Sequence, residues 1–226
     1  MSMGFYVPPE QLIKDRADFA GKGIARGRPI VAVEYAGGIL LMGENPSHSL
    51  HKTGEIYDRI AFAGVGRFNE FETLRVAGIR YADVKGFSYG RIDVTAKGLA
   101  NAYSQTVGQI FTHENKPYEV EMLLAEVGDN TEMNHLYLVQ YDGTLQDERR
   151  FAAIGGKDQE LRDRLDENYT EELDLSGAVR LAAESIEGVE ERQIDDADWE
   201  AAVLDRGNGR RLFRRLTADE IQAARA

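Results

Sequence analysis

The sequence predicts an α+β fold, a four-layer α/β/β/α sandwich that carries an additional helix at its N-terminus. Three observations lead to this prediction. Strand-like runs are joined by short glycine-containing turns, which favours antiparallel pairing. Segments with helical periodicity occur in pairs between the groups of strands. Two sheets packed face to face, each covered by a pair of helices, satisfy both patterns.

The first predicted element is a helix over residues 9–20. Proline is tolerated in the first helical turn, because its missing N–H has no partner there, so Pro8-Pro9 suits the start of this helix. Its apolar residues fall near helical spacing. The sequence Gly21-Lys22-Gly23 predicts that the helix stops before the first strand.

The next elements are strands followed by two helices. Residues 29–35 and 39–42 flank the turn Ala36-Gly37-Gly38 and form a predicted hairpin, and a third strand is predicted over 60–66. The apolar residues then recur every three or four positions, which predicts a helix over 68–81. A second helix is expected to begin near Asp93, whose side chain can cap its N-terminus.

The second half repeats this order. Strands are predicted over 118–127, 135–141 and 150–154, with Asp142-Gly143 as the hairpin turn between the last two. The elements expected after them are helices over 157–168 and 174–187, strands over 200–205 and 211–216, and a final helix over 218–226.

Composition limits the classes of function. The 226 residues are 42% hydrophobic, which suits one large domain with a sizeable core. The absence of cysteine excludes disulfides, thiolate metal sites and cysteine nucleophiles. The net charge of −12 repels phosphate backbones, so nucleic acid is not an expected partner. Neither a membrane span nor a secretory signal is recognisable, so a cytoplasmic location is expected.

Common catalytic motifs do not occur. The histidines have no metal-binding spacing, so neither a metal nor a cofactor is predicted. The serines lack a nucleophile elbow. Gly64-Val65-Gly66 precedes a helix, but Asn69 stands where a dinucleotide-binding loop needs its third glycine. These glycines are better explained by close packing between strand and helix.

Several local stretches together carry a family resemblance: Arg16 to Arg26; Glu34 to Leu41 with Glu44-Asn45-Pro46-Ser47; Gly66 to Phe71; Asp93-Val94-Thr95; Lys116 to Glu121; Tyr141 to Thr144; and Ala153 to Lys157. They are collinear over nearly the whole chain. In these stretches the sequence resembles the α subunits of bacterial 20S proteasomes, in particular those of actinobacteria. The resemblance implies the sandwich of the N-terminal nucleophile hydrolases, as one domain over residues 1–226.

The resemblance also implies that this chain is not itself a peptidase. In this fold the β subunits use a terminal threonine at the start of the first strand, and its α-amino group helps to move the proton. Here about 28 residues precede the first strand, which is expected to begin near Arg28-Pro29, and no threonine stands there. The implied function is a non-catalytic subunit, with no catalytic residue. The alternative is a self-compartmentalising hydrolase of the same fold.

The resemblance assigns partners and a division of the chain. The expected partners are six further copies in a heptameric ring, the β subunits, unfolded protein substrates, and a ring ATPase or ATP-independent activator that docks through C-terminal tails. Residues 1–9 would form a gating tail, 9–21 a collar helix packed on neighbouring subunits, 29–216 the sandwich and 217–226 a terminal helix. Helix 68–81 would contribute to the contact with the β ring. The gate residues are Gly4, Phe5, Tyr6, Val7, Pro8 and Pro9.

An activator pocket is expected at Lys52, Gly66 and Arg26. Judged from its residue type alone, Lys52 is an ordinary solvated lysine. By collinear matching it takes the position of the family's pocket lysine, whose ammonium group pairs with the C-terminal carboxylate of an activator tail. Gly66 would form the pocket floor, where a side chain would block backbone approach. Arg26 is the weaker candidate.

Overall fold

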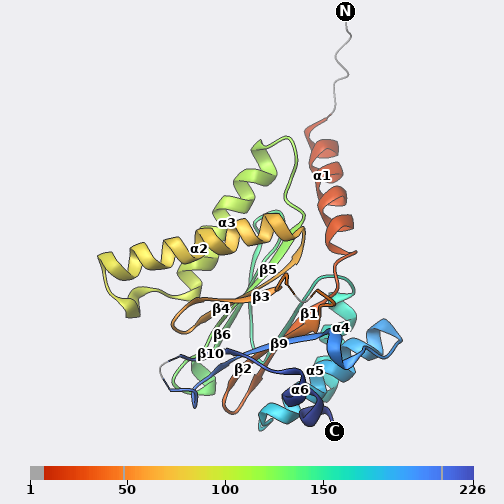
Figure 1. Cartoon of the computed structure of the whole chain (residues 1–226). Coiled ribbons are helices and arrows are strands. Elements are labelled where there is room, and N and C mark those ends of the chain that lie inside the picture. Colours follow the sequence, from red (N-terminus) through yellow and green to blue (C-terminus); the bar gives the residue numbers. More distant parts are fainter. Residues whose placement is uncertain (1–7, 48, 210) are drawn as a thin grey trace, which may run out of the picture.

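The computed structural model describes residues 8–47, 49–209 and 211–226, and within them two five-stranded antiparallel sheets lie face to face (Figure 1). One sheet consists, in spatial order, of β10 (Phe213–Arg215), β9 (Trp199–Asp205), β2 (Gly38–Glu44), β1 (Ile30–Tyr35) and β8 (Phe151–Ile154). The other consists of β3 (Thr53–Tyr57), β4 (Ile60–Gly66), β5 (Val120–Glu126), β6 (His135–Val139) and β7 (Leu145–Glu148). The predicted α/β/β/α sandwich is confirmed.

Helices cover the outer face of each sheet. The sheet with β4 is covered by α2 (Phe68–Ser88) and α3 (Ala96–His113). The sheet with β1 is covered by α4 (Asp158–Asn168), α5 (Leu175–Glu190) and α6 (Ala218–Arg225). These groups lie on opposite sides of the molecule in Figure 1. Among the described residues, no helix has the length and hydropathy needed to cross a membrane.

The core has three apolar layers because the strands are buried on both faces. Phe62 on β4 packs under α2 and α3, whereas its neighbours Ala61 and Ala63 face the other sheet. Small residues between the sheets allow them to approach closely. The third layer, which includes Val31 and Val33 of β1, lies under α4 and α5. Because the strand faces are apolar, polar side chains cluster at the strand ends, along the edge of the sandwich.

The N-terminal helix α1 (Pro9–Ile24) begins where predicted but continues past the expected stop. Gly21-Lys22-Gly23 does not end it. A Cβ atom added at Gly23 would lie 2.2 Å from Oε2 of Glu119, so glycine serves close packing within the helix here. Ala20 and Ile24 are buried, and α1 projects from the sandwich toward the N-terminus (Figure 1).

Two strands escaped prediction, and one hairpin was assigned wrongly. No strand was predicted over the residues of β3 or β7. Asp142-Gly143 does form a turn, with φ of +87° at Gly143, but it leads from β6 into β7. β8 instead pairs with β1 in the other sheet.

Two helix boundaries also differ from the prediction. α2 extends beyond the expected end at Tyr81 to Ser88. The N-cap of α3 is Thr95, whose hydroxyl accepts a hydrogen bond from the backbone N–H of Gly98 at 3.2 Å. Asp93, the predicted cap, lies in a short 3₁₀ helix that precedes it.

Candidate functional site

Lys52 lies immediately before β3, at the edge of the sandwich where β1 begins and β2 ends. Its ammonium group donates hydrogen bonds to the backbone carbonyl oxygen of Glu44 at 2.9 Å and to that of Arg28 at 3.3 Å. An ammonium group has three N–H donors. Lys52 is therefore held by the backbone while it retains the donor capacity to bind an incoming anion.

Burial lowers the pKa of Lys52 to about 8. The carboxylate of Glu200 opposes this shift, Arg28 adds to it, and Glu44 opposes it. The ammonium form therefore predominates at neutral pH but is more easily lost than in a solvated lysine. An anion bound beside it would restore part of the lost stabilisation of the charge.

Glu200, near the start of β9, holds the chain around Lys52 in place. Its carboxylate accepts hydrogen bonds from the backbone N–H groups of Lys52 and Thr53, at 3.1 and 2.9 Å, and from the side chains of Thr53 and Asn45. It also forms an ion pair with Arg215 at 3.0 Å. Burial alone would raise the pKa of Glu200, but the hydrogen bonds from Thr53 and its neighbours hold it below the ordinary value. Because Glu200 and Thr53 belong to different sheets, this carboxylate joins the two layers.

Glu44, the last residue of β2, adds a second buried carboxylate. Its side chain is 3% exposed and forms ion pairs with Arg192 and, at 3.4 Å, with Arg28. A buried carboxylate is stable only when cations and hydrogen-bond donors surround it. The edge of the sandwich at Lys52 is thus a fixed array of charges rather than a set of solvated side chains.

Gly66 ends β4, which is the antiparallel neighbour of β3, and so lies at the same edge as Lys52. Its φ is +110°, and an added Cβ atom would lie 1.9 Å from the carbonyl oxygen of Glu119. Glycine is therefore required by contact within the chain. The segment before β1 links the two residues, because Arg28 accepts the bond from Lys52 and a Cβ atom at Gly27 would lie 3.4 Å from the nitrogen of Gly66.

Arg26 lies between α1 and β1 with its side chain exposed. It is close in sequence to the segment that links Lys52 and Gly66. The structure therefore places the three predicted pocket residues around one connection, residues 25–29, without assigning them a ligand.

The start of the first strand contains neither a hydroxyl nor a thiol. Pro29 and Ile30 occupy it, and both are buried, with Ile30 only 1% exposed. Of the predicted gate, Gly4, Phe5, Tyr6 and Val7 lie outside the described residues. Pro8 is exposed and extended, with φ of −56° and ψ of 140°, and α1 begins at Pro9.

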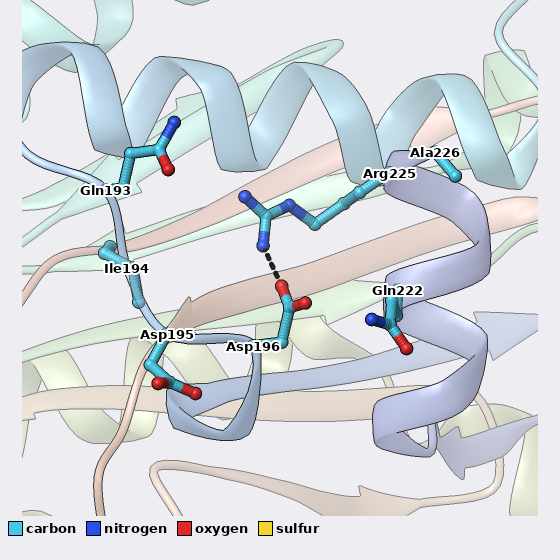
Figure 2. A pocket seen from close by; sticks show the side chains of 7 residues that line it. All are labelled: Gln193, Ile194, Asp195, Asp196, Gln222, Arg225 and Ala226. Atoms are coloured by element: carbon cyan, nitrogen blue, oxygen red, sulfur yellow. Dashed lines mark hydrogen bonds and ion pairs between the residues drawn. The ribbon is translucent and has the colours of Figure 1, made fainter.

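A surface hollow away from Lys52 is formed by other residues. It has a volume of about 510 Å³ and is formed by residues 193–196 and the end of α6 (Figure 2). Figure 2 shows Arg225 directed at Asp196, and the same guanidinium pairs with Glu187 at 2.8 Å and stacks on Trp199. Because Arg225 is already paired with two carboxylates, this hollow is best explained as the place where α6 packs against the rest of the chain. Among the described residues, no group of three or more potential ligands is placed to hold a metal ion.

The partners of Lys52 were missed in the sequence. Glu44 and Asn45 are adjacent, but Glu200 lies far from both along the chain, and the segment Glu44-Asn45-Pro46-Ser47 indicated only the family resemblance. One signal was available: Glu200 is the one charged residue within the otherwise apolar run 199–204 of β9. A charged residue in such a strand is informative because it must have a partner.

Comparisons with known proteins all find the same protein family. Residues 24–204 match the family model described as "Proteasome subunit". The chain is 56% identical to the "Proteasome subunit alpha" of Xylanimonas cellulosilytica, in an alignment that covers 96% of this chain and 93% of that protein. It is 52% identical to that of Thermomonospora curvata, over 98% and 97%. Identity to that of Kineococcus radiotolerans is 54%, over 96% and 95%.

Proposed function

Because the chain belongs to the proteasome subunit family and matches its α subunits over nearly its whole length, we propose that it serves as a non-catalytic α subunit of the 20S core. In this proposal it forms heptameric outer rings that cap β subunits in the cytoplasm. The rings gate the entry of unfolded protein substrates into the β-subunit peptidase chamber. They also dock an activator, either a ring ATPase or an ATP-independent protein, through its C-terminal tails.

The segment ahead of β1 is the observation that carries the proposal. Threonine-type catalysis in this fold needs a free terminal residue at the start of the first strand. Here α1 and the connection after it occupy that part of the chain, and the strand starts at the buried Ile30, directly after the buried Pro29. The same feature disfavours a self-compartmentalising hydrolase, since neither residue can act as a nucleophile. Peptidase activity would then reside in the β subunits.

α1 supports the ring architecture. Leu12, Ile13 and Phe19 are 46%, 56% and 47% exposed in the isolated chain. Apolar side chains on a projecting helix favour burial against another surface. Seven copies related by rotation would bury them in heterologous contacts that close into a ring. In this arrangement residues 1–9 would extend toward the ring axis as the gate, 29–216 would form the sandwich and 217–226 its terminal helix.

The contact with the β ring is better placed at the end of α2 than along residues 68–81. Exposed apolar side chains gather there: Val84 is 66% exposed, Phe87 94%, Tyr89 79% and Ile92 88%. All four lie near the end of α2 or in the connection from α2 to α3. This connection forms one tip of the molecule in Figure 1. A concentration of large exposed apolar side chains is typical of a protein–protein contact.

Lys52 supports activator docking. A C-terminal carboxylate would bind its ammonium group as a charge-assisted hydrogen bond. The backbone bonds to Glu44 and Arg28 reduce the side-chain freedom that is lost on binding. Gly66 and Arg26 would line the same pocket, at the floor and at the rim.

Co-expression with the β subunit of the same source tests the assembly. The proposal predicts a particle of about 700 kDa, from about 28 subunits of similar mass, that hydrolyses peptides only when β is present. Peptidase activity of the chain purified alone would contradict it and favour the self-compartmentalising hydrolase.

A further inference from the structure

Glu119, immediately before β5, is a buried carboxylate with two cationic partners. Its Oε1 lies 2.7 Å from Nε of Arg67 and 3.0 Å from Nζ of Lys116. Its backbone N–H donates to Oε2 of Glu70 at 2.7 Å, and Oε1 of Glu70 accepts from Lys116 at 2.7 Å. The four side chains form one network between α2 and the start of β5. Glu119 also contacts two glycines outside this network, Gly66 and Gly23.

On one side, Glu119 contacts the proposed pocket floor. The backbone N–H of Arg67 donates to the carbonyl oxygen of Glu119 at 2.9 Å, and the same oxygen lies against Gly66. The Arg67 side chain is 57% exposed, so an anion that enters from solvent can reach it. A change at residues 66–67 therefore acts on Glu119 through both its backbone and its side chain.

On the other side, the Glu119 side chain packs against the end of α1, the collar helix that follows the proposed gate residues. Its Oε2 occupies the position that a Cβ atom of Gly23 would need, with a separation of 2.2 Å. Gly23 lies in the last turn of α1, the part of the helix that carries the buried Ala20 and Ile24. The rest of α1 is largely exposed. The position of the helix end thus depends on where this carboxylate lies.

We propose that Glu119 is a positioning residue that couples the pocket floor to the gate helix α1. This inference rests on the proposed gating function. The Arg67–Glu119 ion pair holds the carboxylate against Gly23 and so fixes the end of α1, which in this inference keeps the gate closed. An activator tail bound at Lys52 brings negative charge to the same pocket. Where that charge draws Arg67 away, Glu119 keeps Lys116 as its remaining ion-pair partner. Loss of one of two cationic partners destabilises a buried carboxylate. This favours a shift of the Glu119 side chain, and α1 follows.

The test removes each partner of the ion pair in the assembled particle and needs no activator. The variants are Glu119→Gln, Arg67→Gln and their combination, each with the full chain and with residues 2–7 deleted. The measurement is the basal hydrolysis of a short fluorogenic peptide, together with hydrogen exchange of residues 8–24. Glu72→Gln is the matched control, because it breaks an ion pair with Arg75 on the same helix, at 2.6 Å.

In the full chain we expect each single variant to raise basal hydrolysis about fivefold, the lower end of typical coupling between sites. The double variant should raise it no further, because both changes break one link. Exchange in residues 8–24 should become faster. Arg67→Lys, which keeps the charge, should stay near the unmodified rate, as should Glu72→Gln. With residues 2–7 deleted, none of the variants should change the rate.

Unchanged hydrolysis in both single variants would overturn the coupling, as would effects that multiply in the double variant. Equal effects with and without residues 2–7 would mean that Glu119 acts on assembly or on the β subunits, and would also overturn it. If deleting residues 2–7 alone leaves the rate unchanged, the gating function itself fails and this inference falls with it. The deletion therefore distinguishes the two failures.

Discussion

The ammonium group of Lys52 donates a hydrogen bond to the backbone carbonyl oxygen of Glu44, with 2.9 Å between the two atoms. This bond joins a residue before β3 of one sheet to the last residue of β2 in the other. A lysine fixed in this way loses less conformational entropy on binding an anion than a freely moving one. The relationship makes Lys52 a prepared point charge at the edge of the sandwich.

Lys52→Ala should abolish activator stimulation of peptide hydrolysis and leave basal hydrolysis intact. The lost charge-assisted bond corresponds to about tenfold or more in activator affinity. The measurement compares stimulated and basal rates of the assembled particle. Lys97→Ala, at an exposed lysine on α3, is the matched control and should respond to activator normally. Full stimulation of the Lys52 variant would exclude this residue from the pocket.

Activator affinity should fall as the pH rises from 7 to 9. The pKa of Lys52 is lowered to about 8, so the free site loses its positive charge in this range, whereas an ordinary lysine remains protonated. Lys52→Arg keeps its charge throughout, so any binding that it retains should vary less with pH. Titration of activator binding at several pH values checks this. An affinity that is constant from pH 7 to 9 in the unmodified protein would contradict the prediction.

Glu200→Ala should destabilise the fold strongly. It leaves the buried N–H groups of Lys52 and Thr53 without their acceptor and Arg215 without its carboxylate. Removing one partner of a buried ion pair costs about 3–5 kcal/mol. Urea unfolding of the purified chain at one protein concentration measures the loss. Glu184→Ala, at an exposed position on α5, should change stability by less than about 0.5 kcal/mol.

Glu121 should make stability depend on pH. Burial raises its pKa from 4.5 to about 7, with Asp158 adding to the shift, while the hydrogen bond from Gly155 at 2.8 Å and the nearby Arg162 oppose it. Between pH 4.5 and 7 the folded chain therefore binds more protons at this site than the unfolded chain. Its contribution to stability is complete below pH 4.5 and is lost as the pH rises through 7.

Glu121→Gln should remove this pH-dependent contribution to stability, because the amide stays neutral and its oxygen still accepts a hydrogen bond from the backbone N–H of Gly155. The free energy of unfolding of the variant, relative to the unmodified chain, should increase from pH 5 to pH 8 by up to about 3 kcal/mol. Urea unfolding at the two pH values tests this. Parallel pH dependence of the two proteins would contradict the assignment.

The sequence was sufficient to predict the sandwich but not all of its strands. The hairpin around Ala36-Gly37-Gly38 and the periodicity of the helices are local signals, and both led to correct elements. β7 has the sequence Leu-Gln-Asp-Glu, with one apolar residue, and exists because it pairs with β6. A turn such as Asp142-Gly143 predicts that the chain reverses, not which strand follows. Gly21-Lys22-Gly23 wrongly predicted the end of the first helix. Gly23 is glycine because the distant residue Glu119 packs against it, which local sequence does not reveal.

The candidate site was likewise predictable only in part. Lys52 could be identified only through a family resemblance, since a lone lysine carries no local signal. Its environment could not be predicted, because Arg28, Glu44 and Glu200 meet it only after both sheets have formed. Gly66 was expected to be glycine for a ligand, whereas the positive φ and the carbonyl oxygen of Glu119 already require it within the chain.

The gate is tested most directly by the rate at which the assembled particle hydrolyses a short peptide, with the intact chain and with residues 2–7 deleted. If these residues obstruct the entrance that the α ring forms, the deletion should raise the rate without activator. Particle size and the activity toward a β-specific covalent inhibitor should stay the same. Equal rates for the two particles would contradict the proposal that this chain gates the peptidase chamber.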